Sequence, residues 1–504
     1  MGRYVLGIDQ STQGTKALLF DEEGTLLCRS DLPHRQIVDE RGWVEHDLEE
    51  IYANTIQVIK NLVKKAGIDK KDIAVLGISN QRETAACWEK ESGKPVCHAI
   101  VWQCARGTEI CEEIEKQGYA GMIKERTGIQ LSPYFSAAKL AWIFRNAEGV
   151  KERAKAGKIA CGTIDSFLVY RLTGGKQFRT DYSNASRTQL FNIRTLKWDK
   201  EILDIFGIGP SCMAQVTDSN GDYGETDLEG FLDRPIPIRG VLGDSHGALF
   251  GQGCLKEGMV KATYGTGSSI MMNTGEKPIF TDLGVVTSLA WSMDGKASYV
   301  LEGNINYTGA VISWLKDDVK LISSAEETEA LARQAAAGDK TYLVPAFSGL
   351  GAPYWDSRAA AAISGITRTT GKAEIVRAAL DCIAYQITDI VRAMEKASKI
   401  TISELRVDGG ATKNSYLMQF QSNMLHIPVS VPEEEELSGI GAAYTAGLSA
   451  GIYDRGVFDR MKRKDFQSQM EQKDAERCYE GWKRAVEMVR TNEKKQGQEK
   501  EEKK

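Results

Sequence analysis

Apolar residues near the start of the chain fall into three short runs separated by polar turns, a pattern typical of consecutive strands. The runs are RYVLGID (3–9), KALLFD (16–21) and TLLCRSD (25–31). A longer stretch follows, in which apolar residues recur at helical spacing between Asp47 and Gly67. The run IAVLGIS (73–79) then predicts a further strand. We therefore expect an antiparallel meander followed by a helix and a strand.

A related order of elements returns in the second half of the chain. Strands are predicted at 259–265, 270–275, 286–293 and 299–304, and the polar turn TGSS joins the first two. Because cores stop growing at roughly 250 to 300 residues, a chain of 504 residues should divide into two domains. We expect an α/β protein with an N-terminal domain over 1–250, a C-terminal domain over 251–485 on the same plan, and a shared cleft.

Two charged segments are predicted to lie outside the folded cores. Residues 486–504 lose apolar periodicity and are rich in Lys, Glu and Gln, so they cannot bury enough surface to offset their ordering entropy. We predict a disordered charged tail there. The acidic run PEEEEL (432–437) is predicted to be an exposed loop rather than a metal site, because no partner ligands with defined spacing accompany it.

Composition excludes several classes of protein. Hydrophobic residues make up 42% and charged residues 26% of the chain, the balance of a globular protein, and a net charge of −5 argues against a nucleic-acid surface. The ten cysteines form no CxxC pair, which favours reduced thiols. No apolar run approaches the roughly 20 residues that span a bilayer, and no secretory signal is visible. We expect a cytoplasmic protein without a nucleic-acid or membrane partner.

Four glycine-rich loops at predicted strand ends are candidates for phosphate contact. They are GIDQSTQGTK (7–16), GDSHG (243–247), TYGTGSS (263–269) and VDGGATKN (407–414). Glycine lets the backbone come close to a ligand, and hydroxyls with free N–H groups suit phosphate oxygens. Taken singly, each fits an ordinary tight turn, and no Walker loop occurs. Together they predict phosphate loops on both sides of a cleft, as in an actin-type ATPase.

Longer motifs resemble the FGGY family of carbohydrate kinases, and within it the glycerol kinases, from about residue 4 to 452. They include GISNQRET (77–84), AIVWQ (99–103), DYSNASRTQLFNI (181–193), ALFGQ (248–252), YGTG (264–267), VPAFSGLGAPYW (344–355) and VDGGAT (407–412). The resemblance implies two ribonuclease-H-like domains of actin/hexokinase type around an ATP cleft. It also implies Mg²⁺-assisted phosphorylation by ATP of a terminal hydroxyl on a small polyol or ketose.

The resemblance also implies residue roles. Asp244 matches the catalytic base and Asp9 the metal-side aspartate. The substrate pocket is expected to comprise Arg82, Glu83, Trp102, Tyr134, Asp244, Ser245 and Ser269. The nucleotide contacts are expected to comprise Thr12, Gln13, Gly14, Lys16, Thr266, Gly309, Ser313, Gly410 and Asn414. The chemistry needs such groups, because an alcohol is a poor nucleophile until a carboxylate accepts its proton, and phosphoryl transfer needs charge neutralisation.

Structural roles remain possible for the same residues. Arg82 and Glu83 could form a surface ion pair, Trp102 and Tyr134 could be core aromatics, and Asp244 could cap a helix starting at His246. The surrounding family pattern favours the functional roles. His246 itself is expected to be a structural histidine with satisfied hydrogen bonds.

Two of the positions that depart from the glycerol-kinase pattern belong to the expected substrate pocket. Ser245 stands where a glutamine is usual and Ser269 where an aromatic residue is usual. Both changes shorten the side chain, so the alternative substrate is a four- or five-carbon polyol or pentulose such as erythritol, xylitol, xylulose or ribulose, with glycerol a poor substrate. A catalytically silent actin-like ATP-binding regulator is less favoured, because it would not need the polyol residues. The family alone suggests a homodimer or homotetramer.

Overall fold

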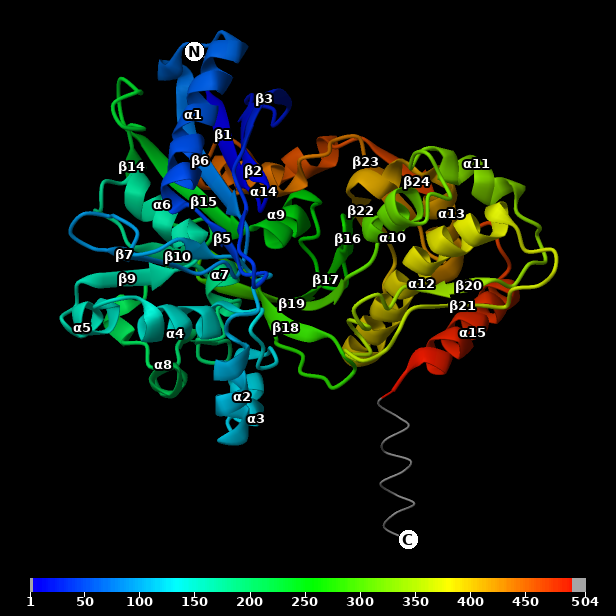
Figure 1. The fold of residues 1–504 in the computed structure, drawn as a ribbon. Coiled ribbons are helices and arrows are strands. Elements are labelled where there is room, and N and C mark those ends of the chain that lie inside the picture. The colour runs from blue at the N-terminus through cyan, green and yellow to red at the C-terminus, as the bar shows by residue number, and fades with distance from the viewer. Residues whose placement is uncertain (1–2, 492–504) are drawn as a thin grey trace.

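The computed structural model describes residues 3–491 and contains two large mixed β-sheets with helices packed around them (Figure 1). The sheet built from the first half of the chain lies on the left of the view. The second sheet lies to its right, with yellow helices packed beside it. The arrangement confirms the α/β class with two units built on one plan.

The first sheet has the strand order β14-β15-β6-β1-β2-β3. Its strands are β1 (Tyr4–Gln10), β2 (Gly14–Phe20), β3 (Leu26–Pro33), β6 (Ile73–Asn80), β14 (Glu225–Thr226) and β15 (Ile236–Gly243). β1 pairs antiparallel with β2 and parallel with β6, which pairs parallel with β15. The carboxyl ends of β1, β6 and β15 therefore meet at one edge, and they carry Asp9, Arg82 and Asp244.

The second sheet repeats this plan in the order β18-β19-β17-β16-β22-β23-β24. Its strands are β16 (Val260–Tyr264), β17 (Ser268–Gly275), β18 (Val286–Met293), β19 (Lys296–Ile305), β22 (Leu405–Asp408), β23 (Val429–Pro432) and β24 (Arg463–Phe466). β16 pairs antiparallel with β17 and parallel with β22, as β1 does with β2 and β6. The strands predicted in both halves are confirmed.

Short ladders extend the first unit and flank the second. They are β4 (Ile37–Val38) with β5 (Val44–His46) and β8 (Ala99–Ile100), β7 (Ala86–Glu89) with β9 (Ile159–Gly162), β10 (Arg179–Asp181) with β13 (Gln215–Thr217), β11 (Phe191–Asn192) with β12 (Lys197–Trp198), and β20 (Tyr342–Val344) with β21 (Ala362–Ser364).

The α-helices pack mainly against the sheets and ladders. They are α1 (Leu48–Ala66), α2 (Thr108–Lys116), α3 (Ala120–Thr127), α4 (Ser136–Asn146), α5 (Val150–Lys155), α6 (Ile164–Leu172), α7 (Tyr182–Ser186), α8 (Lys200–Phe206), α9 (Asp244–Gly251), α10 (Gly309–Ser313), α11 (Glu327–Gln334), α12 (Lys372–Ser398), α13 (Ser415–Leu425), α14 (Leu437–Ser449) and α15 (Gln472–Val489). The predicted helix after Asp47 is confirmed: the Asp47 side chain caps α1, and Gly67 ends it in the left-handed conformation. Within residues 3–491 no helix combines the length and apolarity needed to cross a bilayer.

Helix α14 comes late in the chain but packs on the first sheet and on α9. Glycines permit this close approach: an added Cβ would lie 2.8 Å from the Gly439 oxygen at Gly7, and 2.1 Å from the Ala442 oxygen at Gly77. At Gly240 of β15 the same atom would lie 2.7 Å from the Ala442 oxygen. The chain therefore crosses back from the second sheet to the first, which brings Glu436, the residue before α14, to Lys16 near the start of β2.

This crossing corrects the prediction for the acidic run at 432–437. Glu436 is only 7% exposed and forms ion pairs with Lys16 and Arg29 on the first sheet, so the end of the run is a buried contact rather than a free loop. The predicted tail also begins too early, because residues 486–489 belong to α15. Residues 490 and 491 follow α15, and Thr491 donates to Asp356 at 2.6 and 2.7 Å, whereas residues 492–504 of the predicted tail lie outside the described residues.

We predict that Gly77→Ala lowers the Tm by several degrees, because the new methyl group would overlap the α14 backbone and overpacking typically costs about 1–3 kcal/mol. Gly121→Ala in α3 is the matched control, since an added Cβ there meets nothing within 4 Å and alanine favours a helix. Differential scanning calorimetry of both variants checks this. Equal Tm values for the two variants would contradict the tight packing of α14.

Candidate active site

Asp244 is the first residue of α9 and directly follows the carboxyl end of β15. Its carboxylate accepts a hydrogen bond from the Ser245 backbone N–H and pairs with Arg82, whose Nε lies 3.0 Å from Oδ1. The side chain is 34% exposed. A role as cap for a helix starting at His246 does not describe the structure, because the helix begins at Asp244 itself.

Five charged side chains form a chain of alternating sign that starts at Asp244. Arg82 donates two hydrogen bonds to Glu302, at 3.0 and 3.2 Å. Arg187 pairs with the same carboxylate, Nη1 lying 2.8 Å from Oε2, and its Nε donates to Glu83 at 2.6 Å. Apart from Asp244, the members of this buried charge chain are at most 5% exposed. Arg82 and Glu83 are therefore not a surface ion pair.

The buried charge chain is held in its ionised form by its own members. Burial alone would raise the pKa of Glu302, but the guanidinium groups of Arg187 and Arg82 hold that pKa well below its usual range. Burial alone would lower the pKa of Arg82, and Glu302 and Glu83 reverse the effect. Because Glu302 lies on β19 and both arginines lie in the first half of the chain, these contacts join the first unit to the second sheet.

Two aromatic rings form a wall beside these charges. The Trp102 and Tyr134 ring centroids lie 5.4 Å apart, and both residues are half-buried rather than part of a closed core. Trp102 Nε1 donates to Thr12 Oγ1 at 2.9 Å, which fixes the wall to the first glycine-rich loop. Lys139 Nζ donates to the backbone carbonyls of Pro133 and Phe135, at 2.6 and 3.1 Å, and so fixes the segment that carries Tyr134.

Asp9 lies near the end of β1, directly opposite Lys16 on β2. Burial raises the pKa of Asp9 to about 6; Lys16 opposes the rise, and the charges of Glu436 and Asp244 add to it. The Lys16 ammonium pairs with Glu436 at 2.6 Å. Ser11 closes the intervening turn, with its N–H 2.8 Å from the Gly14 oxygen, and Gln13 at its tip is exposed.

A cavity of about 730 Å³ opens on the second unit and collects several of the predicted nucleotide residues. Its lining includes Thr266, Gly309, Ser313, Gly410 and Asn414. The loop holding Thr266 is bound to the start of α10, because the oxygens of Gly265 and Thr266 accept the N–H groups of Gly309 and Ala310 at 2.9 and 3.0 Å. Asn414 also caps α13. The other predicted nucleotide residues do not line this cavity: Thr12 and Gln13 lie in the turn between β1 and β2, and Gly14 and Lys16 lie at the start of β2.

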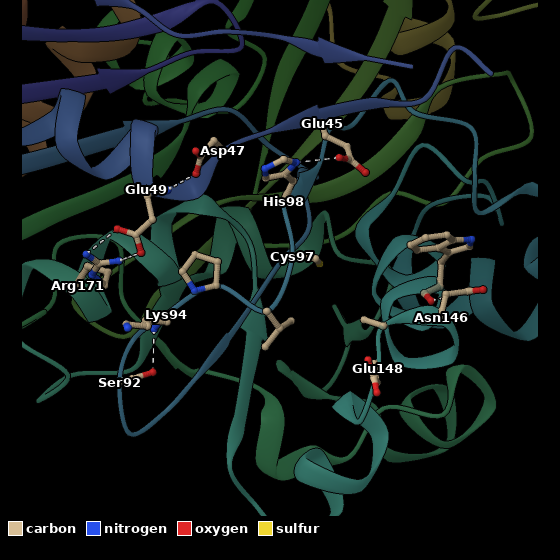
Figure 2. A pocket seen from close by; sticks show the side chains of 14 residues that line it. Glu45, Asp47, Glu49, Ser92, Lys94, Cys97, His98, Asn146, Glu148 and Arg171 are labelled. Atoms are coloured by element: carbon tan, nitrogen blue, oxygen red, sulfur yellow. Dashed lines mark hydrogen bonds and ion pairs between the residues drawn. The ribbon is translucent and has the colours of Figure 1, made fainter. Parts of the chain in front are cut away.

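Another hollow, of about 900 Å³, lies on the first unit and is lined by a different set of residues (Figure 2). Several of its charged groups pair with neighbours: Glu45 with His98 and Arg106, and Glu49 with Arg171. None of the predicted site residues lines it. The predicted site residues therefore lie outside this groove.

Two serines and a histidine stand close to the buried charge chain. Ser245 is half-buried in the first turn of α9, and Ser269 lies on β17 with its hydroxyl shielded from solvent and without a hydrogen-bond partner among the described residues. His246 is fully buried, and both of its ring nitrogens also lack partners there, so the expectation of a satisfied histidine is wrong. Burial, with Arg82 next in size, lowers the pKa of His246 well below its usual value.

Arg187 and Glu302 were not predicted as site residues from the sequence. Arg187 lies in the motif DYSNASRTQLFNI (181–193), and Glu302 lies in the strand predicted at 299–304. Neither side-chain charge was given a role. The available signal was a glutamate inside the apolar run YVLEGN, since a charge buried in a strand needs a partner. The sequence offered no means of naming that partner, because Arg187 lies more than 100 positions away.

Comparisons with known proteins agree with this geometry. The model of the N-terminal domain of the FGGY family of carbohydrate kinases matches residues 4–251, and that of the C-terminal domain matches residues 260–450. Glycerol kinase 1 of Thermotoga maritima is 50% identical over 97% of this chain and 100% of its own length. The structure of Plasmodium falciparum glycerol kinase with ADP is 35% identical, with a TM-score of 0.91 over 97% of this chain and 98% of that one. A xylulose kinase from Lactobacillus acidophilus shares the fold at 22% identity, with a TM-score of 0.87 over 96% of this chain and 97% of that one.

We predict that Glu302→Gln destabilises the protein by about 3–5 kcal/mol, because it leaves two buried guanidinium groups short of negative charge. Glu480→Gln is the control: it breaks an exposed pair with Lys483, which is worth at most about 1 kcal/mol. Thermal unfolding of both variants is the measurement. A Glu302→Gln protein as stable as the control would show that the buried charge chain does not hold the sheets together.

Proposed function

The chain belongs to the FGGY family of carbohydrate kinases and is therefore an enzyme that transfers a phosphoryl group to an alcohol; we propose that its acceptor is a terminal hydroxyl of glycerol and its donor is ATP. The relatives named glycerol kinase support the acceptor, and the relative bound to ADP supports the donor. The observation that carries the proposal is the placement of Asp244. Its carboxylate is partly exposed and pairs with Arg82, which in turn pairs with Glu302 of the second sheet.

Asp244 is the proposed general base. Arg82 and the Ser245 N–H both contact Oδ1, which leaves Oδ2 to accept the proton of the attacking hydroxyl. A positioned base of this kind contributes roughly 10²- to 10⁴-fold to rate. Arg82 cannot swing away without breaking two bonds to buried Glu302, so the base is fixed before substrate arrives.

The polyol is proposed to bind between the aromatic wall and the buried charge chain. The Trp102 and Tyr134 rings offer apolar faces to the carbon chain, and Arg82 and Glu83 offer a donor and an acceptor to its hydroxyls. Because Glu83 and Arg187 fix each other at 2.6 Å, the acceptor geometry is set by the protein and not by the ligand. Ser245 and Ser269 complete the proposed pocket.

The nucleotide is proposed to bind the 730 Å³ cavity, with its phosphates directed toward the first sheet. A Cβ added at Gly410 would meet nothing within 4 Å, so the backbone there is open to a ligand. Thr12, Gln13, Gly14 and Lys16 would meet the phosphates from the opposite side. Asn414 and Ser313 line the part of the cavity expected to take the rest of the nucleotide.

The residues present fit a magnesium ion. The described residues contain no group of three or more His, Cys, Asp or Glu side chains that could hold a metal ion. Mg²⁺ does not need such a group, because it binds one or two carboxylates together with water and substrate phosphates. Asp9 is a buried carboxylate at the strand end, with one oxygen accepting from Ser79 at 3.3 Å. When bound, Mg²⁺ would neutralise phosphate charge, and Asp9 would hold it.

We also infer that the enzyme is cytoplasmic and assembles as a homodimer or homotetramer. Ten unpaired cysteines support a reducing compartment. The oligomeric state rests on the family alone, and light scattering of the purified protein measures it.

We predict that Asp244→Asn lowers kcat for glycerol at least 100-fold while the Kd for ADP changes less than about threefold, because only the proton acceptor is removed. A coupled ADP-release assay and calorimetric ADP titration give the two numbers. Asp69→Asn, at an exposed turn, is the control and should retain activity. If Asp244→Asn retains wild-type turnover, Asp244 is not the base.

We predict that Asp9→Asn raises the Mg²⁺ concentration for half-maximal activity at least tenfold, since an amide binds Mg²⁺ more weakly than a carboxylate. Asp31→Asn, an exposed neighbour on β3, should leave that concentration unchanged. Magnesium titrations of glycerol-dependent ADP release, after chelator treatment, compare the three proteins. An unchanged magnesium requirement in Asp9→Asn would remove Asp9 from the metal site.

A further inference from the structure

We propose that Glu436 and Arg29 are positioning residues that determine how tightly the Lys16 ammonium binds the phosphates of the donor. Glu436 competes with the phosphates for Lys16, and Arg29 weakens that competition by neutralising Glu436 at its other oxygen. The inference rests on the proposed function, because Lys16 is proposed there to meet the phosphates. It assigns a role to two residues that lie outside the predicted site.

Two cations of the first sheet contact the carboxylate of Glu436, one at each oxygen. Lys16 Nζ lies 2.6 Å from Oε2, and Arg29 Nη1 pairs with Oε1. Glu436 directly precedes α14, and only 7% of its side chain is exposed. Because a buried carboxylate needs a cation, both contacts contribute to keeping Glu436 ionised where α14 meets the first sheet.

The strand register places the two cations on one face of the first sheet. On β2 and β3, Lys16 stands opposite Asp31, and Leu18 stands opposite Arg29. Side chains two positions apart on a strand share a face, so Lys16, Asp31 and Arg29 project from the same face. A Cβ added at Gly439 of α14 would lie 2.2 Å from Leu18, which places the start of that helix on this face.

The two cations differ in their surroundings. The Lys16 side chain is 30% exposed and stands opposite Asp9 on β1, where the phosphates are proposed to bind. Arg29 also pairs with Asp31, its Nε lying 3.3 Å from Oδ1, and this contact keeps the guanidinium beside β3. When Lys16 turns to a phosphate, Arg29 therefore stays with Glu436, and the buried carboxylate keeps a cation.

Electrostatics gives the direction of each effect. A phosphate oxygen and the Glu436 carboxylate attract the same ammonium, so a change at one alters the binding of the other. A neutral side chain at 436 leaves Lys16 available to the phosphates and strengthens ATP binding. Loss of Arg29 leaves Lys16 to neutralise the buried carboxylate and weakens ATP binding. Opposite effects identify competition, because a loss of structure would weaken binding in both variants.

The test measures the KM for ATP at saturating glycerol in wild type, Glu436→Gln, Arg29→Gln and two controls. We expect Glu436→Gln to lower this KM about threefold or more and Arg29→Gln to raise it about threefold or more, with kcat within about twofold of wild type. Glu433→Gln, at an exposed position of the same acidic run, and Arg41→Gln, in an exposed pair with Asp39, remove the same charges elsewhere. Both controls should leave the KM for ATP unchanged.

Three results overturn the inference while the proposed function stands. They are a KM for ATP that fails to fall in Glu436→Gln, one that fails to rise in Arg29→Gln, and shifts in the controls as large as those in the variants. If Glu436→Gln does not fold, Arg29→Gln decides, because the Arg29 side chain is 41% exposed.

A double variant separates this inference from the proposed function. Lys16→Met should raise the KM for ATP, and adding Glu436→Gln to it should have no further effect, because Glu436 acts through Lys16. Additive effects overturn the inference. A wild-type KM for ATP in Lys16→Met means that the proposed phosphate contact of Lys16 has failed. Absence of ADP release with glycerol, from wild-type protein that binds ADP, means that the proposed function itself has failed.

Discussion

The site depends on one buried carboxylate, Glu302, which binds two arginines that reach it from the other half of the chain. A buried carboxylate with no cation would strongly destabilise the fold, and two buried guanidinium groups with no anion would destabilise it further. Their mutual neutralisation determines where Arg82 lies, and Arg82 determines where the Asp244 carboxylate lies. The position of the proposed base is therefore set from the second sheet, although the base itself belongs to the first.

The packing of helix α14 on the first sheet also positions the strand ends that carry the candidate site residues. Helix α14 returns from the end of the chain to lie on Gly7, Gly77 and Gly240, and the residue just before it, Glu436, pairs with Lys16 beside Asp9. Elements far apart in sequence thus converge on the strand ends that carry the chemistry. Neither unit alone holds both the proposed base, Asp244, and the cavity proposed for the nucleotide.

Much of the fold could be predicted because it is encoded locally. Apolar runs bounded by glycine predicted the strands, and Asp47 and Gly67 predicted where α1 begins and ends. Asp244 could be proposed from a motif and directly follows a strand, and Thr266 could be proposed from another motif and lines the 730 Å³ cavity. Their roles in catalysis and nucleotide binding stay predictions. The partnership of Arg187 with Glu302 and the burial of Glu436 could not be predicted, because both depend on long-range pairing that no local pattern records. The unpartnered nitrogens of His246 are a further case, since burial and the choice of partners follow from packing.

The central claim is that the cleft transfers a phosphoryl group from ATP to the terminal hydroxyl of a small polyol. The most direct measurement is ³¹P and ¹H NMR of the products formed from ATP and glycerol by the wild-type enzyme. The account predicts one phosphate ester for each ADP, with its phosphorus coupled to a CH₂ group. Phosphate found on the central carbon, or ADP formed with free phosphate and no ester, would contradict it.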